Sequence, residues 1–343
     1  MPMSGIIRWW AGLAVVVVVL AGCQGGGTLG PVGGGEGVRQ RSLAVLEESA
    51  GSGDAVLRCH ALEGLAACWP GEAWPAVRRG LGDEVAAVRF AAALAAGDAR
   101  VSSARPMLEK LLRDDSAAVR LAAGYGLEKL GDGRFGGWYD QALAGRDARL
   151  QGQACLLLGK LGATEVHPEA RQQLWRVLRQ VGQGASVKLQ AAEALARLGD
   201  DSVLAKLLAY ASSGYADDRI LAIAGLGELS GEADARAMLF VLSEDVQAEV
   251  ALAAVRALGR RATAEQLEWA RGQLGSGGIE GDAGSRSRVR ALAALAVGAT
   301  GGPGDAQRLG RLLGDESGYV RVAAARAVGE CLGGHRGESK GMK

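Results

Sequence analysis

The chain has 343 residues, 39 basic and 38 acidic side chains, a formal net charge of +1 and only 4% aromatic residues. This balance argues against a nucleic-acid-binding protein, which normally carries an excess of Lys and Arg. The few aromatic and many Ala residues favour closely packed helices with small side chains between them.

Residues 1–22 have the pattern of a targeting segment. Arg8 lies in a short basic head, and the apolar run 14–20 that follows is shorter than the ~20 residues of a membrane-spanning helix. The sequence Leu20-Ala21-Gly22-Cys23 resembles the lipobox of bacterial lipoproteins. This resemblance implies cleavage before Cys23, a diacyl thioether on its sulfur and acylation of the new amine, which together give stable anchoring. An uncleaved anchor and an ordinary secretory signal are the alternatives.

The Gly-rich residues that follow Cys23 are expected to form a flexible tether, so that residues 23–37 comprise the lipidated Cys and its linker. The residue after Cys23 is Gln24 and not Asp. In this respect the sequence resembles lipoproteins sorted to the outer membrane. We therefore expect an exported protein on the periplasmic side of that membrane. The amphipathic segment Val38–Glu48 is interpreted as an N-terminal capping helix.

One pattern then recurs nine times: an aliphatic residue, usually followed by Arg, and an Ala-rich stretch that closes eight residues later. Successive copies are separated by 31, 31, 31, 37, 31, 32, 39 and 31 residues. The copies begin at Leu57, Val88, Val119, Leu150, Val187, Asp218, Val250, Val289 and Val320. A period held near this value indicates a repeat protein of the solenoid type.

Each copy predicts a pair of short amphipathic helices. In the first helix, residues such as Val119, Ala123 and Leu127 lie on one face. Asp residues five positions before the copies are expected to cap these helices, and Gly residues after them to end them. These residues are Asp83, Asp114, Asp245 and Asp315, and Gly131, Gly162 and Gly199. Because two short helices cannot bury both apolar faces alone, we predict an all-α solenoid over residues 38–334, followed by a disordered tail at 335–343.

The segments Asp83–Ala92 and Asp315–Ala324 resemble HEAT repeats, in the short variety called PBS-lyase HEAT-like repeats. The resemblance implies a superhelix of about nine helical hairpins, with the first helices on the convex face and the second helices on the concave face. It also implies a ladder between repeats, formed by Asp83 with Arg89, Asp114 with Arg120 and Asp315 with Arg321. That ladder is expected to break where Gln151 and Ala251 replace the Arg. Trp69 and Trp74 are expected to cover the open end of the first repeats.

No catalytic constellation is visible in the sequence. His60, His167 and His335 lie far apart along the repeats, and no Cys-x-x-Cys, phosphate loop or Gly-x-Ser-x-Gly is present. Enzymes of this family that bind di-iron use His-Glu dipeptides, which this chain lacks. Relatives that attach bilin pigments work in the cytoplasm, in conflict with export. We expect no metal and no cofactor, and four cysteines without disulfides: Cys59, Cys68, Cys155 and Cys331.

A column of side chains on the second helices is predicted to point into the concave groove. Its cations and aromatics are of the kinds that dominate binding interfaces. An ordinary solvated helix face is the alternative interpretation. With neighbouring cations and Trp175, the candidate partner-binding residues are Arg79, Lys110, Arg113, Trp175, Arg176, Arg179, Lys206, Phe240, Trp269 and Arg311.

The sequence thus predicts a monomeric, lipid-anchored envelope protein that serves as an interaction scaffold without enzyme activity. The expected partner is an envelope protein or an acidic peptide held in the groove, with no role for nucleic acid. The alternative is an enzyme, or an enzyme subunit, that acts on an envelope component.

Overall fold

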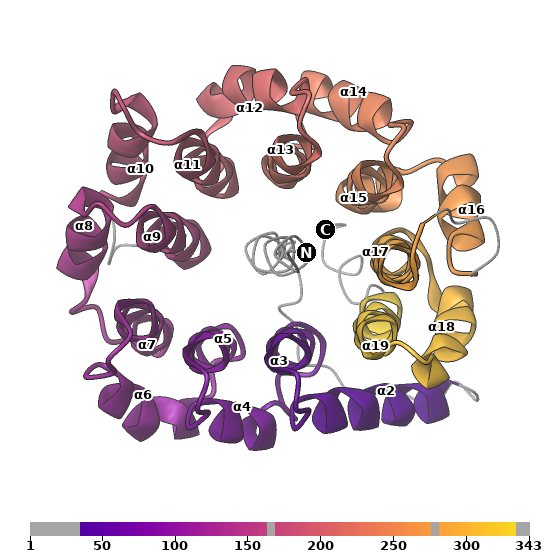
Figure 1. Ribbon diagram of the computed structural model, residues 1–343, viewed down its shortest axis with the longest axis horizontal. Coiled ribbons are helices and arrows are strands. Elements are labelled where there is room, and N and C mark those ends of the chain that lie inside the picture. Colours follow the sequence, from indigo (N-terminus) through magenta and orange to yellow (C-terminus); the bar gives the residue numbers. More distant parts are fainter. Residues whose placement is uncertain (1–34, 163–168, 276–280, 334–343) are drawn as a thin grey trace, which may run out of the picture.

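The computed structural model describes residues 35–162, 169–275 and 281–333, and these segments are all-α, with helices packed in pairs. The segments 1–34 and 334–343, which include the predicted lipobox and tail, lie outside the described residues. The helices form two concentric rows (Figure 1).

The outer row consists of short helices that lie along the rim of the molecule (Figure 1). They are α2 (Gly35–Ser49), α4 (Trp74–Gly80), α6 (Arg105–Leu111), α8 (Gly136–Ala144), α10 (Ala170–Arg179), α12 (Leu204–Ala211), α14 (Ala233–Leu242), α16 (Ala264–Gly272) and α18 (Pro303–Gly310). Single 3₁₀ turns lie beside several of them: η1 (Ser102–Ala104), η2 (Asp201–Val203), η3 (Gly259–Arg261) and η4 (Leu312–Gly314).

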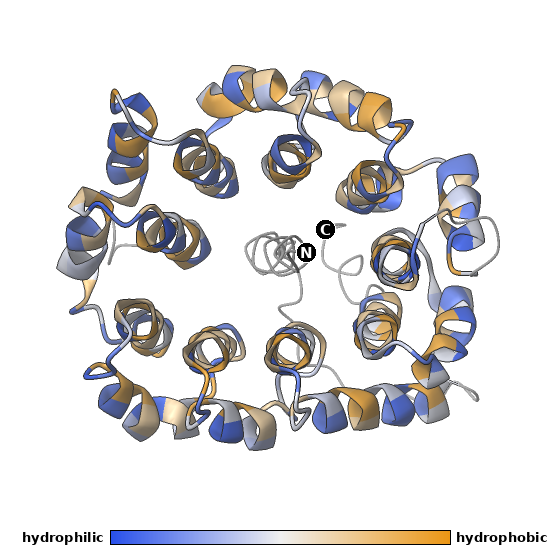
Figure 2. Ribbon diagram, viewed as in Figure 1, coloured by the Kyte–Doolittle hydropathy of each residue, from blue (hydrophilic) through white to orange (hydrophobic). Residues whose placement is uncertain are grey.

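The inner row contains the Ala-rich helices that the repeated pattern predicted. They are α3 (Ala55–Cys68), α5 (Ala86–Asp98), α7 (Ala117–Lys129), α9 (Ala148–Leu161), α11 (Ala185–Arg197), α13 (Ala216–Glu228), α15 (Ala248–Leu258), α17 (Ala283–Thr300) and α19 (Gly318–Gly333). Both rows mix polar and apolar residues along each helix, as expected for amphipathic helices (Figure 2). Within the described segments, no helix is long and apolar enough to span a bilayer.

The sequence predicted that the Asp residues before the inner helices cap them, and this is wrong. These residues instead stabilise the turn in front of each helix. Asp114 accepts a hydrogen bond from the backbone N–H of Ser116 at 2.9 Å, and Ser116 itself is the residue that precedes α7. The same arrangement recurs at Asp83, Asp245 and Asp315. The correction follows from spacing, because each Asp lies two residues before the cap position and forms an Asx turn there. Gly131, Gly162 and Gly199 do adopt positive φ, as predicted.

These Asp side chains also join successive repeats. The guanidinium of Arg89 contacts the Asp114 carboxylate at 2.7 Å, and its other arm donates to the carbonyl of Asp83 at 2.9 Å. Equivalent ion pairs link Arg58 to Asp83, Arg219 to Asp245, and Arg290 to Asp315. Each Arg therefore fixes its own turn and the turn of the next repeat. The predicted pair of Asp83 with Arg89 is thus wrong for the carboxylate, because Arg89 bonds to the Asp83 backbone carbonyl while the Asp83 carboxylate pairs with Arg58.

The ladder changes at Gln151, where the sequence predicted a break. The Gln151 amide donates to the carbonyls of Leu143 and Gly145 at 3.0 and 2.9 Å and accepts from Gln183 at 2.8 Å. A buried amide network thus replaces the ion pair between these repeats.

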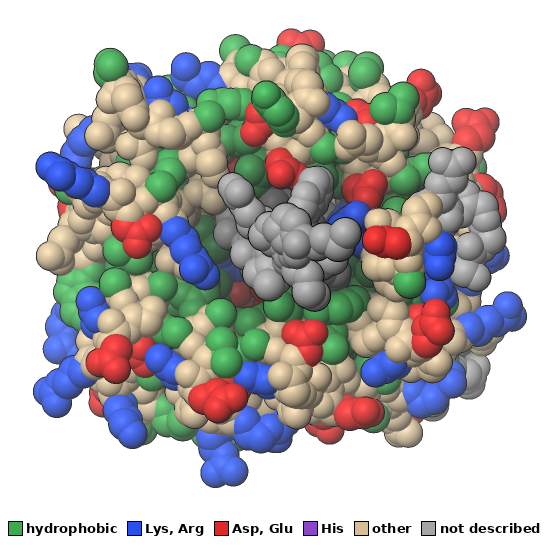
Figure 3. Space-filling view, viewed as in Figure 1, with side chains coloured by type: hydrophobic (Ala, Val, Ile, Leu, Met, Phe, Trp, Pro, Cys, Tyr) green, Lys and Arg blue, Asp and Glu red, His purple; other side chains and the backbone are tan. Residues whose placement is uncertain are grey.

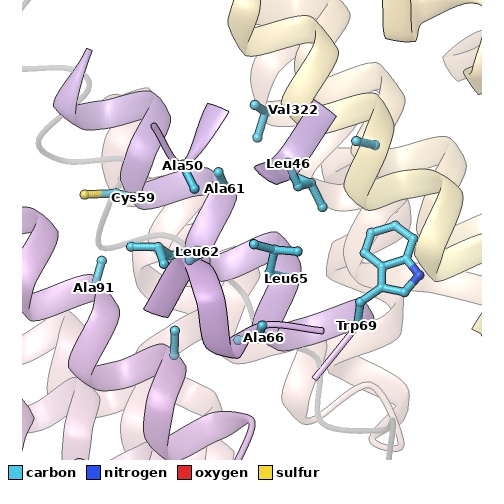
Figure 4. Close-up of a cluster of buried hydrophobic side chains, with 14 of the residues drawn as sticks. Leu46, Ala50, Cys59, Ala61, Leu62, Leu65, Ala66, Trp69, Ala91 and Val322 are labelled. Carbon is cyan, nitrogen blue, oxygen red and sulfur yellow. The ribbon is translucent and has the colours of Figure 1, made fainter. Parts of the chain in front are cut away.

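The two ends of the solenoid meet and close the molecule into a ring (Figure 1). Helix α19 packs against α2 and α3, and the Tyr319 hydroxyl donates to Asp54 at 2.6 Å. Leu46, Leu65, Trp69 and Val322 are buried around this seam (Figure 4).

The expected open end, with a capping helix and with Trp69 and Trp74 as its cover, is therefore wrong. Helix α2 belongs to the outer row, and Trp69 packs against α19 because the ring has no free first repeat.

Candidate binding surfaces of the ring

The predicted partner-binding residues lie on the outer row of helices or directly after it, and therefore on the convex rim (Figure 1). This contradicts their expected placement in the concave groove. The residues concerned are Arg79, Lys110, Arg113, Trp175, Arg176, Arg179, Lys206, Phe240, Trp269 and Arg311.

The physical reason is the size of the side chains between neighbouring helices. A Cβ added to Gly97 would lie 3.0 Å from the Cα of Gly126, and one added to Gly159 would lie 3.0 Å from the Cα of Ala194. Such close approach permits the shorter inner circumference, whereas the Leu-rich second helices occupy the longer outer one. The Ala-rich first helices therefore line the inside.

The predicted column also changes register along the rim. Leu207 and Leu239 are among the buried residues of α12 and α14, and Ala270 is buried in α16. They lie three, one and three positions beyond the apolar residues from which the column was counted, which are Leu204, Met238 and Leu267. Phe240 and Trp269 therefore lie next to the outward-facing positions of their helices. In α14 the outward-facing residue is Val241.

On the rim, the predicted residues form one local cluster rather than a continuous strip. The Trp175 indole donates to Asp200 at 2.8 Å, and the Arg179 guanidinium lies 4.8 Å from the ring centre. Arg176 points elsewhere, toward Asp140 at 3.7 Å. Only Trp175 and Arg179 are brought together.

A cavity of about 340 Å³ opens among α3, α5, α7 and α9 of the inner row. Its apolar lining includes Phe90, Leu94, Leu150 and Leu156, and Gln153 adds an amide. Phe90, Leu94 and Leu150 are only partly buried, although their size would suit a core position. The cavity is thus an apolar hollow on the concave side of the ring.

Two of the charged groups at the cavity are paired with each other. The Lys160 ammonium lies 2.9 Å from the Asp98 carboxylate, which also accepts a hydrogen bond from the Tyr125 hydroxyl. Burial, together with Asp98, raises the pKa of Tyr125 well above its usual range. Burial also raises the pKa of the Cys59 thiol to about 12, so Cys59 is a neutral thiol at pH 7.

The described residues contain no group of His, Cys, Asp and Glu side chains that could hold a metal ion. His60 interacts with Glu63 at 3.1 Å on α3, while His167 and His335 lie outside the described segments. Among the described residues, Cys59, Cys155 and Cys331 are free thiols, and the Cys68 thiol donates to the Arg326 carbonyl at 3.5 Å.

Sequence reasoning missed the cavity because it assigned the inner helices to the convex face. A signal was nevertheless present, since Phe90 and Leu94 are bulky residues on a helix otherwise rich in Ala. Without knowing which row faces inward, such residues cannot be distinguished from core residues.

Comparison with known proteins supports the repeat architecture. Residues 43–128 match the model for HEAT repeats. A comparison with curated proteins gave no match.

Several solved structures are similar at low sequence identity. The complex of CpcE and CpcF of phycocyanin lyase from Nostoc has a TM-score of 0.42 and 21% identity, over 79% of this chain and 97% of the other. Human deoxyhypusine hydroxylase has a TM-score of 0.38 and 18% identity, over 77% and 97% of the two chains. The karyopherin Kap121p bound to the SUMO protease Ulp1p has a TM-score of 0.33 and 16% identity, over 82% and 36%. Residues 43–128 are thus similar to HEAT repeats, and the helices of the described segments pack pairwise as HEAT-like hairpins.

Proposed function

We propose that this protein is a lipid-anchored scaffold of the bacterial cell envelope that binds a partner protein on the concave side of its ring. The supporting observation is the cavity of about 340 Å³ among α3, α5, α7 and α9, where large apolar side chains remain accessible. Concave apolar surfaces with few polar groups are the usual form of binding sites.

The chemistry of the cavity favours an apolar anchor from the partner. Phe90, Leu94 and Leu150 would surround that side chain, and burying them would give roughly 25 cal/mol for each Å² of apolar surface. The nearby Asp98 and Lys160 neutralise each other, and the other charged residues of the lining are Glu63, Asp147 and Arg149, so the cavity carries little net charge. The partner is therefore proposed to be a protein segment with a large apolar residue, bound by a monomeric ring.

The role is proposed to be binding without catalysis. Asp98 is committed to Lys160 and Tyr125, and the Cys59 thiol is not ionised at neutral pH. An activated nucleophile would require a lowered pKa or a neighbouring base.

The anchor in this proposal is Cys23, with acyl chains on its sulfur and amine. Helix α2 begins at Gly35, twelve residues after Cys23. A fully extended segment of that length spans roughly 40 Å, which would keep the ring close to the bilayer surface.

Photo-crosslinking in intact cells tests both parts of the proposal. A photoreactive amino acid would replace Phe90 or Gln153 in the cavity, and Lys110 on the rim would serve as the control. We expect one shared adduct from the two cavity positions and none from Lys110. In a Cys23→Ser companion, the protein should lose its acyl chains, as read by mass spectrometry.

An adduct at Lys110 with none at Phe90 or Gln153 would overturn the cavity as the binding site and return the partner to the rim. An unlipidated Cys23 in the parent protein would overturn the anchor independently of the crosslinking result.

A further inference from the structure

Three large hydrophobic side chains are unusually exposed in one sector of the ring. Tyr215 is 76% exposed, Val241 65% and Val246 98%. Tyr215 lies in the turn before α13, Val241 near the end of α14, and Val246 in the turn before α15. We call these three residues the 215–246 patch. Figure 3 shows hydrophobic side chains at the surface of this sector, over α12 and α14 at the top of the view.

The two turns that carry the patch lie side by side. Arg219 on α13 contacts Asp245 in the second turn at 2.9 Å, and it also donates to the Ser213 carbonyl in the first turn at 2.9 Å. The backbone N–H of Glu244 donates to the Val241 carbonyl at 3.2 Å, which connects the end of α14 to the same turn. The patch is therefore held in place by the ladder between repeats.

The fold itself does not require apolar residues at these positions, because the other repeats provide an internal comparison. The positions equivalent to Val246 include Glu84, Asp115, Gln183 and Glu316. Those equivalent to Tyr215 include Asp54, Ser116, Asp147 and Ser317. Those equivalent to Val241 include Arg79, Lys110, Arg176 and Arg311. The same turns and helices thus form elsewhere with polar side chains, and the exposed apolar surface has another cause.

The charges beside the patch are acidic. Asp217 on α13 and Glu244 after α14 are both exposed, whereas the nearby cation Arg219 is paired with Asp245. Carboxylates at this place oppose an anionic lipid surface and favour a cationic partner. Exposed apolar surface rimmed by polar groups marks a site of protein interaction.

From this geometry we propose that the 215–246 patch is a second docking surface, which binds a basic and apolar segment of a partner protein. Tyr215, Val241 and Val246 supply the apolar contacts, while Asp217 and Glu244 attract the cations. The turns are fixed before binding by Arg219, so little conformational entropy is lost on association. This surface is distinct from the cavity among α3, α5, α7 and α9, and either proposal can fail without the other.

The test uses two synthetic amphipathic helices, one of Leu and Lys and one of Leu and Glu, labelled and titrated with the purified protein by fluorescence anisotropy. We expect the Lys peptide to bind more tightly. The double variant Tyr215→Ser/Val246→Ser should weaken its binding at least tenfold, and Asp217→Asn/Glu244→Gln should weaken it and reduce its salt dependence. Val181→Ser is the matched control, since Val181 is 95% exposed in the turn before α11, and it should leave binding unchanged.

Five results would overturn the proposal. Four of them are equal binding of both peptides, unchanged binding by the double variant, an equal loss in Val181→Ser, and concentration-dependent self-association that the double variant abolishes. The last of these would assign the patch to a second copy of the chain. Sedimentation with neutral lipid vesicles that depends on Tyr215 and Val246 would likewise assign it to a membrane surface.

Discussion

At the scale of single residues, each Arg of the ladder between repeats has two roles. It holds the turn of its own repeat and it binds the Asp of the next repeat. Arg89 holds the turn of its own repeat through the Asp83 carbonyl and reaches the Asp114 carboxylate of the next repeat. Both side chains are largely buried, with 18% and 8% exposed. The two parallel N–H···O bonds give this pair more strength than a surface ion pair.

The first prediction concerns Asp114→Asn, which should lower the free energy of unfolding by about 1–2 kcal/mol at pH 7, because it removes the charge-assisted bonds from Arg89. Chemical denaturation measures this change. Asp115→Asn is the control, since the Asp115 side chain is exposed and Arg120 bonds to its backbone carbonyl, at 3.1 Å. Equal losses in the two variants would show that the pair with Arg89 has no special weight.

The same pair predicts a pH dependence. The hydrogen bonds that Arg89 donates lower the pKa of the Asp114 carboxyl in the folded protein. The stabilisation is therefore fully present above the unfolded pKa of about 3.9 and is lost as the pH falls through the lower folded value. The difference in stability between the parent protein and Asp114→Asn should thus be constant near neutrality and shrink below about pH 4.

At the scale of helices, small residues set the distance between neighbours in the inner row. Gly298 on α17 faces α19, and a Cβ added there would lie 2.7 Å from the Cα and Cβ of Ala327. Backbone atoms cannot move aside as a flexible side chain can. The packing of α17 against α19 therefore depends on the absence of this one carbon atom.

Gly298→Ala should consequently destabilise the protein by about 1–3 kcal/mol, despite the higher helix propensity of Ala. Thermal unfolding followed by circular dichroism gives the comparison. Gly137→Ala on α8 is the matched control, because no atom lies within 4 Å of the added Cβ, and it should leave stability unchanged or slightly raised. A neutral Gly298→Ala would mean that the two helices separate without cost.

At the scale of the whole molecule, closure of the ring is the main structural result. Repeat proteins are stabilised chiefly by contacts between neighbours, so an open solenoid would leave two terminal faces in need of polar caps. Here the terminal faces cover each other, with Trp69, Leu46 and Val322 buried between them. The cavity among α3, α5, α7 and α9 lies on the inner side that closure encloses.

Gly329→Leu tests this closure. A Cβ at Gly329 would lie 2.5 Å from the Cβ of Cys68 and 2.8 Å from the Trp69 ring, so the larger side chain should separate α19 from α3. Because the other repeats keep their neighbours, we expect a larger radius of gyration in small-angle X-ray scattering with unchanged helix content.

Gly333→Leu, on the same helix but with no atom within 4 Å of an added Cβ, should retain the dimensions of the parent protein. An unaltered radius of gyration in Gly329→Leu would show that the seam can absorb the side chain and that closure does not depend on this contact.

The sequence by itself determined the helices, their pairing and the residues that join repeats. These properties follow from short-range patterns, such as the recurring Val-Arg and Ala-Ala spacing and the glycines at 131, 162 and 199. The types of ladder residue were predictable for the same reason, although the link from Arg89 to Asp114 spans two repeats.

Only the tertiary structure decided that the ring closes, which row of helices faces inward, and where the cavity and the 215–246 patch lie. The rotation between neighbouring repeats is small and depends on many side chains, such as Gly97 against Gly126. These rotations accumulate around the molecule, so a slight change in each would convert a ring into an open superhelix. Phe90 lies on the inner side of the ring and Trp269 on the outer side because of these accumulated rotations. A local sequence pattern does not contain this information.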